Sequence, residues 1–592
     1  MILGQADIWM PTAQELHLFG PELGLVGAIV GVLIVAMVAG RNAQVTSAVA
    51  LLGTLAALML TAHTAVRVVS GGLAGMAPAQ STPMLIVDNF SVFFKLFISM
   101  FLALITWLWL IGVASREAAP DRTRAALQSP PEFFVLLLTS ALGMCLMVGT
   151  LNLLVIMIAI ETASLPSYAI VASDKRSRPG AEASLKYVLF GATTAAVMVY
   201  GISLLYGVFH TLDVPTIAAR MALDPAPVGV LGWLGLLGVG VGIAFKISAV
   251  PVHFWCPDVF EGAPIEVTTW LSVASKAAGL GLLLRIVLAF VSAGAGEAAM
   301  PLAYGIGAIA AVTCTVGNLA ALRQTSVKRM LAYSSIAHAG YMMMLTAIFV
   351  PPALAARSNA ATAALIAYLF VYLLMNLGAF GITAMVAWRT GSDQLSSFTG
   401  LGRRSPWLAL PMAVCLFSLI GLPPLGGFAA KWWLLIALGK AATVAGQEWL
   451  WVLVIVAVVN TVISLYYYVG VVRQMYLADD PRQPAFDAPF GGLVMVHACA
   501  VLLLLLGTIC FGPLGDRASA YASNLFFPAG QQTTLQSPER ERRVDPVRGG
   551  VAARSSPLAG ARGSVFPERE RRVATETDFA MTSGDALSGG HP

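Results

Sequence analysis

Charged residues are scarce in this sequence. Only 11% of the 592 residues are Asp, Glu, Lys or Arg, whereas 58% are hydrophobic. A soluble domain carries roughly 25% charged residues, so the composition excludes an ordinary soluble protein. The apolar residues come in blocks of about 20, the length that an α-helix needs to cross a ~30 Å hydrocarbon core. The sequence therefore predicts an all-α polytopic membrane protein.

Signals for cofactor binding are also missing. The six cysteines are scattered, and none forms a C-x-x-C pair or clusters with histidines, which argues against an iron–sulfur or zinc site. We find no dinucleotide-binding fingerprint and no signal-peptide pattern at the N-terminus. The net charge of +5 is inflated by an arginine-rich C-terminal tail. We therefore expect no cofactor, no metal and no nucleic-acid partner for this chain.

About fourteen apolar spans can be counted along the chain. They lie near residues 22–39, 45–66, 91–113, 132–149, 151–172, 184–208, 228–254, 265–294, 301–322, 330–350, 360–388, 407–440, 448–475 and 488–512. We divide the chain into N-terminal helices (1–90), a first half (91–300), a second half (301–480), a final helix (481–512) and a polar tail (513–592). The tail is poor in large apolar residues and repeats the string PERERRV, so we predict that it is disordered and assign it no function.

Basic residues sort with the parity of the loops. Loops after even-numbered spans carry few of them, such as Arg220, Arg357 and Lys440. Loops after odd-numbered spans carry most: Arg116, Arg122, Arg124, Lys175, Arg176, Arg178, Arg323, Lys328, Arg329, Arg389, Arg403, Arg404, Arg473 and Arg482. The positive-inside rule places the odd loops in the cytoplasm and both termini on the outer side. The loop after span 7, CPDVFEGAPIE, is acidic instead, and we expect it to do more than set topology.

Several ionisable residues lie within the apolar spans. Each costs about 2.5–3.5 kcal/mol near the membrane centre, so such residues are candidates for a functional site. The candidates are Glu161, Lys186, Lys246, His253, Lys276, His338 and Lys431. Glu161 and Lys186 also fit side chains that reach the membrane interface, and His253 also fits a partner for freed backbone groups. We expect Lys95 to be interfacial and Arg285 to pair with a carbonyl or carboxylate.

Three of the lysines are central in their spans, whereas the one obvious buried carboxylate is Glu161. Burial lowers the proton affinity of a lysine in general, and a nearby carboxylate raises it. Movement of Glu161 relative to Lys246 would therefore change how tightly that lysine holds its proton. A row of such groups, joined by water and imidazoles, is a proton relay.

Two spans are interrupted by proline. Pro251 follows Lys246, whereas Pro423 and Pro424 lie in GLPPLGG, shortly before Lys431. Broken backbone at membrane depth is tolerated only against protein or a hydrated cavity. Two broken spans about five spans apart are typical of inverted repeats in transporters. We predict that spans 4–8 and 9–13 are two inverted five-helix repeats, each containing a broken helix.

Several strings carry a family resemblance: EFFVLLLTSALGMCLM, IAIETASLPSYAIVA, EASLKYVLFGA, FKISAVPVHFWCPDVFEGAP, VASKAAGLGLLLRIV, VKRMLAYSSIAHAGYMMM and SLIGLPPLGGFAAKWW. Together they resemble the antiporter-like subunits of respiratory complex I over about residues 90–480. Within that family the chain is most similar to subunit N of bacterial NADH-quinone oxidoreductase. A lysine at 431 argues against subunit M, and the lack of a long lateral helix after span 14 argues against subunit L.

The resemblance implies a role for each candidate. Glu161 and Lys246 match the family's pair that modulates proton affinity, Lys276 matches the link between two half-channels, and Lys431 matches the terminal residue on the exit side. Lys186 matches a further lysine of the family on span 6, and His253 matches a histidine on the broken span. His338 remains a candidate from the sequence alone.

The resemblance further implies that the chain belongs to a proton-translocating NADH:quinone oxidoreductase in a bacterial inner membrane. NADH, FMN, iron–sulfur clusters and quinone are then expected in partner subunits, and no redox centre in this chain. The expected partners are a flanking antiporter-like subunit, small ND-type membrane subunits and the lipid bilayer.

Two alternatives stay open from the sequence. The chain fits an Mrp-type monovalent cation/proton antiporter subunit, or subunit L or M, because these share the Glu–Lys pair and the broken helices. It also fits a membrane scaffold that conducts nothing, in which the lysines are fixed counter-ions. Exchange of Na⁺ or K⁺ without a redox partner separates the first alternative, and unchanged pumping after replacement of Lys246 separates the second.

Overall fold

The computed structural model of the chain describes residues 17–38, 42–69, 84–117, 130–223, 228–295, 298–348, 355–478 and 488–522. The helices of these residues are α2 (Gly20–Val38), α3 (Ala43–Val69), α4 (Asn89–Glu117), α5 (Pro130–Val148), α6 (Leu153–Val171), α7 (Arg178–Phe209), α8 (Val214–Leu223), α9 (Gly229–Ile247), α10 (Trp255–Gly262), α11 (Ile265–Trp270), α12 (Lys276–Ser292), α13 (Met300–Ala321), α14 (Val327–Thr346), α15 (Ala355–Thr390), α16 (Leu401–Arg404), α17 (Pro406–Ile420), α18 (Gly426–Ala442), α19 (Leu450–Tyr476), α20 (Phe490–Thr508) and α21 (Phe511–Ala522). Two short 3₁₀ turns, η1 (His17–Phe19) and η6 (Leu395–Phe398), and a π-helical turn, η4 (Leu271–Ser275), complete them.

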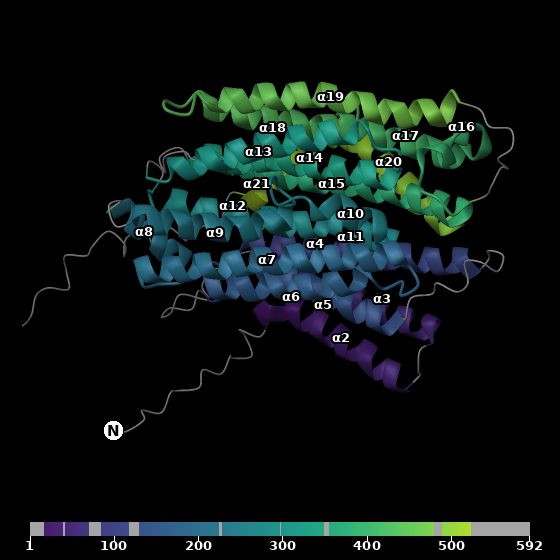
Figure 1. The fold of residues 1–592 in the computed structure, drawn as a ribbon, viewed down its shortest axis with the longest axis horizontal. Coiled ribbons are helices and arrows are strands. Elements are labelled where there is room, and N and C mark those ends of the chain that lie inside the picture. The colour runs from purple at the N-terminus through teal and green to yellow at the C-terminus, as the bar shows by residue number, and fades with distance from the viewer. Residues whose placement is uncertain are drawn as a thin grey trace, which may run out of the picture. The chain divides into compact units, whose positions relative to one another are not determined.

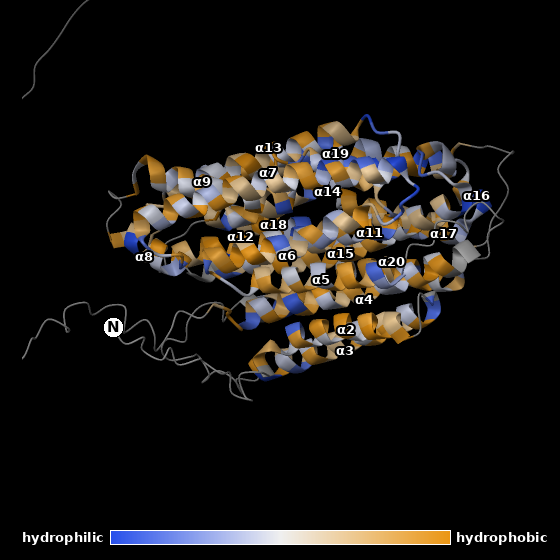
Figure 2. Ribbon diagram, turned by 60° about the horizontal axis from the view of Figure 1, so that its bottom comes forward, coloured by the Kyte–Doolittle hydropathy of each residue, from blue (hydrophilic) through white to orange (hydrophobic). Residues whose placement is uncertain are grey.

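The described part of the chain is an all-α polytopic membrane fold, as predicted. Twelve of its helices are long and apolar enough to cross a membrane. Two other predicted spans coincide with α14, which carries Lys328, Arg329 and His338, and with α17 and α18, which a break divides. Most of the helices consist largely of apolar residues, whereas strongly hydrophilic residues gather in connections such as those near α16 (Figure 2). The total of fourteen spans stays a prediction.

Two spans are enclosed by the others. In residues 265–292, which comprise α11, η4 and α12, and in residues 359–390 of α15, 94% of the residues in the most apolar 18-residue stretch are buried. The span 265–292 packs on α5, α9 and α14, and α15 packs on α14, α17, α18, α20 and α21. These elements run side by side in the middle of the bundle (Figure 1). Any ionisable group on them is therefore surrounded by protein rather than lipid.

The first predicted helix break is present at the end of α9. Ser248 adopts a left-handed backbone conformation with φ 65°, and the amide of Ala249 returns to the carbonyl oxygen of Ala244 at 2.8 Å. The chain then passes through the cis Val250–Pro251 peptide bond and starts α10 at Trp255. This is the αL ending that commonly closes helices.

The second break has the same form. Gly421 has φ 89°, and the amide of Leu422 returns to the carbonyl oxygen of Phe417 at 3.1 Å. A cis Pro423–Pro424 bond follows, and α18 begins two residues later. Pro251 and the Pro423–Pro424 pair therefore mark the breaks at the predicted positions.

A second feature also occurs once in each half. Asn152 caps the N-terminus of α6 and forms an isolated β-bridge with Asp213, which follows α7. Ser326 caps the N-terminus of α14 and forms an isolated bridge with Gln394, which follows α15. Both halves thus fasten the start of one helix to the end of the next long one by the same backbone contact.

One prediction for the C-terminal region is wrong at its start. Residues 513–522, expected to begin a disordered tail, lie in α21, which packs on α15, α4 and α20. Trp433 of α18 lies close to Gly515 of this helix. The rest of the predicted tail, 523–592, lies outside the described residues.

Candidate functional site

Lys246 occupies the last turn of α9, one residue before the helix ends. Its side chain is 2% exposed, and its ammonium lies 5.9 Å from the centre of the Phe245 ring. The hydroxyl of Ser275, on the π-helical turn η4, donates a hydrogen bond to the backbone oxygen of Lys246 at 3.2 Å. The end of α9 is therefore tied directly to the enclosed span.

Glu161 lies on α6 and is half-buried. It lines a narrow pocket of about 10 Å³ with Tyr168, Thr194 and Gly242, between α6, α7 and α9. That volume holds about one water molecule. Glu161 and Lys246 are close enough for their charges to interact, but they form no ion pair within 4.0 Å in the described structure. The two groups are separate in this structure, and their pairing stays a prediction.

Lys276 begins α12, directly after the π-helical turn, and is fully buried. Its ammonium lies 3.7 Å from the sulfur of Cys256 and 5.1 Å from the centre of the Phe260 ring, both on α10. A polarisable sulfur and an aromatic face are weak substitutes for a carboxylate. π-Helical turns occur frequently at functional sites.

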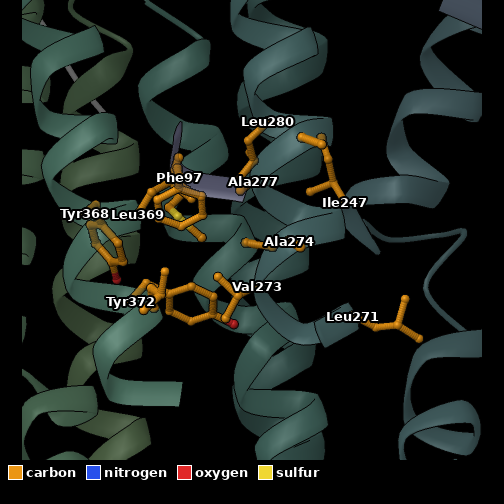
Figure 3. Close-up of a cluster of buried hydrophobic side chains, with 14 of the residues drawn as sticks. Phe97, Ile247, Leu271, Val273, Ala274, Ala277, Leu280, Tyr368, Leu369 and Tyr372 are labelled. Carbon is orange, nitrogen blue, oxygen red and sulfur yellow. The ribbon is translucent and has the colours of Figure 1, made fainter. Parts of the chain in front are cut away.

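His338 joins the two halves through tyrosines of α15. Its Nδ1 lies 2.9 Å from the hydroxyl of Tyr368, and its ring centre is 5.3 Å from that of Tyr372. The Tyr372 hydroxyl in turn donates to the backbone oxygen of Ser272 on the π-helical turn at 3.3 Å. Figure 3 shows Tyr372 lying against Val273 of that turn, within an otherwise apolar core. His338 therefore connects the surroundings of Lys276 with the second half.

Lys431 lies on α18 after the second break and is 7% exposed. Its ammonium donates a hydrogen bond to the backbone oxygen of Ile420 at 2.9 Å and lies 4.7 Å from the centre of the Tyr341 ring. The rings of Tyr341 and His338 are 5.7 Å apart. Like Lys246 and Lys276, Lys431 forms no ion pair within 4.0 Å with any described carboxylate. Buried amines without a counter-ion are groups whose protonation responds to small changes around them.

Lys246, Lys276, His338 and Lys431 form a row of buried ionisable residues, and the structure does not bring Lys186 and His253 into it. Lys186 is 39% exposed near the start of α7 and pairs with Glu182 and Asp258, each at 2.8 Å. His253 lies in the first break, where its ring centre is 4.5 Å from that of Phe254 and the two rings are tilted by 33°. Its Nδ1 is buried and has no hydrogen-bond partner among the described residues. Their predicted roles in a relay remain predictions.

An ion-pair cluster around Asp258 was not identified from the sequence. Asp258 on α10 pairs with Lys186 at 2.8 Å and with Arg329 of α14 at 3.2 Å, and Arg329 also pairs with Glu261. Ser248 and Gly421 are the left-handed residues that end the helix at the first and the second break. The separation in sequence between Ser248 and Asp258 equals that between Gly421 and Lys431, so Asp258 occupies the position in the first half that Lys431 occupies in the second. The acidic composition of the loop after span 7 was the signal for this cluster, which holds α7, α10 and α14 together.

Two charged residues outside the row are fixed by carboxylates. Arg285 on α12 pairs with Asp88 at 2.7 Å, as predicted. Lys95 on α4, which was expected at the interface, is 2% exposed and pairs with Glu22 of α2 at 2.7 Å. Glu22 lies far away in the sequence, so no local pattern indicated the pairing.

All six cysteines are free thiols. Among the described residues, no three His, Cys, Asp or Glu side chains are grouped so that they could hold a metal ion.

The sequence and the structure both match known proteins. The family described as NADH:quinone oxidoreductase/Mrp antiporter, TM, matches residues 150–464. NADH-quinone oxidoreductase subunit N of Anaeromyxobacter sp. (strain Fw109-5) is 37% identical over 514 residues, which cover 83% of this chain and 93% of the relative. NADH-quinone oxidoreductase subunit N 2 of Sorangium cellulosum is 37% identical over 532 residues, covering 87% and 99%.

Solved structures agree. A chain of respiratory complex I from Thermus thermophilus with bound aureothin is 31% identical, with a TM-score of 0.63 and coverage of 83% of this chain and 98% of that chain. A chain of the Mrp complex from Dietzia sp. DQ12-45-1b has a TM-score of 0.70 at 21% identity, covering 88% and 100%, and shows the shared fold alone. The chain therefore belongs to the NADH:quinone oxidoreductase/Mrp antiporter membrane family, in the branch of NADH-quinone oxidoreductase subunit N.

Proposed function

We propose that this chain moves protons across a bacterial inner membrane as the antiporter-like subunit N of NADH-quinone oxidoreductase. One observation carries the proposal: Lys246 on α9, Lys276 on α12 and Lys431 on α18 are buried amines that form no ion pair within 4.0 Å with any described carboxylate. Fixed structural charges in a membrane are normally paired, as Lys95 and Arg285 are here. Unpaired buried amines are instead suited to gaining and losing a proton.

The contacts suggest an order of transfer. Glu161 modulates Lys246, whose backbone carbonyl is held by the π-helical turn that precedes Lys276. From that turn, Tyr372 and His338 lead to Lys431. Each amine takes up a proton as its neighbour releases one, and water between them would carry the proton over gaps too long for a direct hydrogen bond.

Inverted repeats would place the two broken helices for this task. The proposal of two copies, spans 4–8 and 9–13, is supported by the shared αL endings at Ser248 and Gly421 and by the paired β-bridges of α6 and α14. An odd number of spans in each copy gives the second copy the opposite orientation. One lysine-bearing break then faces each side of the membrane.

Free energy for transport must come from outside this chain. We infer that NADH, FMN, iron–sulfur clusters and quinone reside in partner subunits, and that a flanking antiporter-like subunit and small membrane subunits adjoin this one. We also infer that both termini lie on the outer side. An Mrp-type antiporter is not favoured, because the relatives that match at 37% identity over most of the chain are named subunit N.

Replacement of Lys246 tests the function. Lys246→Ala is made in the assembled complex, and NADH-driven quinone reduction and proton uptake into inverted membrane vesicles are measured together. Both are expected to fall while the complex stays assembled. Lys175→Ala, which removes an exposed loop lysine, is the matched control and is expected to pump like the parent.

Unchanged pumping in Lys246→Ala would contradict the relay and favour a structural lysine. Sodium-driven exchange by the chain without its redox partners would instead favour the antiporter alternative.

A further inference from the structure

A second polar region lies in the second half, away from the row of lysines described above. It begins at a pocket of about 140 Å³ between the 321–327 connection, the start of α14, η6 and α19. Thr325 and Tyr466, at the rim, are exposed, whereas Tyr467 at the inner wall is 5% exposed. A pocket of this size is large enough for several water molecules, and Gln324, Thr325 and Ser326 supply polar groups to a lining that is otherwise mostly apolar. The pocket opens beside the basic residue Arg323, on the side of the membrane that the basic loops mark.

Hydrogen-bonded side chains continue inward from this pocket. The Tyr467 hydroxyl donates to Oδ1 of Asn318 on α13 at 2.9 Å. Nδ2 of Asn318 donates to Oδ1 of Asn460 on α19 at 3.1 Å, and Nδ2 of Asn460 donates to the hydroxyl of Thr315 at 3.0 Å. Asn318 is fully buried and Asn460 almost so. The group therefore forms a polar chain across apolar surroundings.

The chain leads on to Lys431. Nδ2 of Asn318 lies 3.8 Å from the sulfur of Cys314, and the Cys314 thiol is near enough to Tyr341 for the two groups to influence each other. The Tyr341 hydroxyl also lies 3.3 Å from the hydroxyl of Thr461, and the Tyr341 ring lies 4.7 Å from the Lys431 ammonium. Polar side chains thus lie at intervals between the pocket and Tyr341, whose ring contacts the buried amine of Lys431.

We propose that the pocket and the Tyr467–Asn318–Cys314–Tyr341 series form a route by which protons reach Lys431 from the side of the basic loops. This route rests on the proposed function, because it presupposes that Lys431 changes its protonation state. A proton from water in the pocket passes inward from one hydroxyl to the next, and the neutral amine of Lys431 accepts it. The Asn318 amide orients the Tyr467 hydroxyl but does not itself take up the proton, so water entering from the pocket would have to carry the proton past Asn318. Lys431 then has an uptake route of its own, besides the proton that arrives through His338.

Interhelical hydrogen bonds between α13 and α19 would also explain Asn318 and Asn460 as structural contacts. That explanation accounts for the amide pair but not for a pocket that ends at Tyr467 or for the thiol and phenol that continue to Lys431. The two explanations differ in what removal of a single hydroxyl does. Structural contacts affect stability, whereas a route affects the supply of protons.

Single-hydroxyl variants in the assembled complex supply the first test. In Tyr467→Phe and Tyr341→Phe, proton uptake into inverted vesicles is expected to fall several-fold, and to fall more at alkaline than at acidic external pH because proton supply becomes limiting. Tyr304→Phe is the matched control, since Tyr304 lies on α13 at its opposite end and is 49% exposed. A loss that is the same at every pH and follows reduced assembly would overturn the route in favour of structural contacts.

Blocking the pocket supplies the second test. Gly470 lines the pocket and has open space where a Cβ would lie. Gly470→Cys, in a Cys510→Ser background, is treated with a bulky membrane-impermeant thiol reagent from the outside of inverted vesicles. Proton uptake is expected to be lost on labelling. Arg323→Cys, on the neighbouring exposed loop but outside the pocket lining, is expected to keep pumping when labelled.

Lys431→Met separates this inference from the proposed function. If Lys431→Met stops pumping while Tyr467→Phe and labelled Gly470→Cys pump at the parent rate, Lys431 is on a proton path and the route proposed here is wrong. If Lys431→Met itself pumps normally, both the route and the role of Lys431 fail.

Discussion

The ammonium of Lys431 donates a hydrogen bond to the backbone oxygen of Ile420, the last residue of α17. Carbonyls at the end of a helix have lost their amide partners, and a positive charge there interacts favourably with the helix dipole. Lys246 lies on the other side of its break and forms no equivalent bond among the described contacts. The two broken spans therefore share a backbone form while holding their lysines in different ways.

Arginine at position 431 distinguishes a proton carrier from a fixed charge. Lys431→Arg keeps the positive charge and the donors for Ile420, but a guanidinium does not release its proton at physiological pH. We expect Lys431→Arg to stop proton uptake into inverted vesicles as completely as Lys431→Met does, with the complex assembled in both. Near-parent pumping by Lys431→Arg would show that position 431 needs only a charge.

Neutralising Glu161 removes a carboxylate whose charge acts on Lys246, the one found among the described residues. Glu161→Gln keeps the size of the side chain and its place in the narrow pocket, so packing of α6 on α7 should be retained. We expect proton uptake to fall several-fold and its pH profile to shift. Glu182→Gln, which removes a carboxylate that is 67% exposed, is the control and should leave the profile in place. Identical profiles for the two variants would contradict the proposed pairing of Glu161 with Lys246.

Features encoded within one segment were predictable from the sequence. Prolines mark both breaks, because proline cannot continue a helix and glycine or a polar residue closes it. The central lysines were found for a similar reason, since an ionisable residue inside an apolar run is visible without knowing its neighbours.

Features that depend on packing between distant segments were not predictable. Lys95 looks interfacial in its own segment, and only the fold brings Glu22 of α2 to it. Tyr372 and Cys256 read as ordinary core residues, and they gain interest only because α15 and α10 place them beside Ser272 and Lys276. Lys186 lies within an apolar span, as a relay residue would, yet α7 places it near the protein surface, where it pairs with two carboxylates.

Breaking the buried Lys95–Glu22 pair should destabilise the N-terminal helices without affecting transport. Removing one partner of a buried pair typically costs about 3–5 kcal/mol, whereas replacing both with apolar residues is often neutral. We therefore expect Lys95→Met to weaken the attachment of α2 to α4, and Lys95→Met with Glu22→Leu to recover most of the loss. Limited proteolysis of the purified complex measures the first effect, and proton uptake in the double variant should match the parent. Lost pumping in a well-assembled double variant would place this pair in the transport path.

At the second break, α17 and α18 approach each other so closely at Gly427 that only a glycine fits there. A Cβ on Gly427 would overlap the carbonyl oxygen of Ser418, whose hydroxyl accepts a hydrogen bond from the Gly427 amide at 2.9 Å. Gly427→Ala must push α18 away from α17 and so move Lys431 away from Ile420. We expect reduced thermal stability, by about 1–3 kcal/mol, together with lost proton uptake.

Gly439 on the same helix provides the control. A Cβ there meets Trp451 at 3.6 Å, which is an ordinary contact. Gly439→Ala should be neutral or stabilising by up to about 1 kcal/mol, because alanine favours the helix. If both variants pump like the parent, the close packing at the break does not position Lys431. If Gly427→Ala alone loses pumping while the complex remains assembled, the geometry of the break and the protonation of Lys431 are coupled.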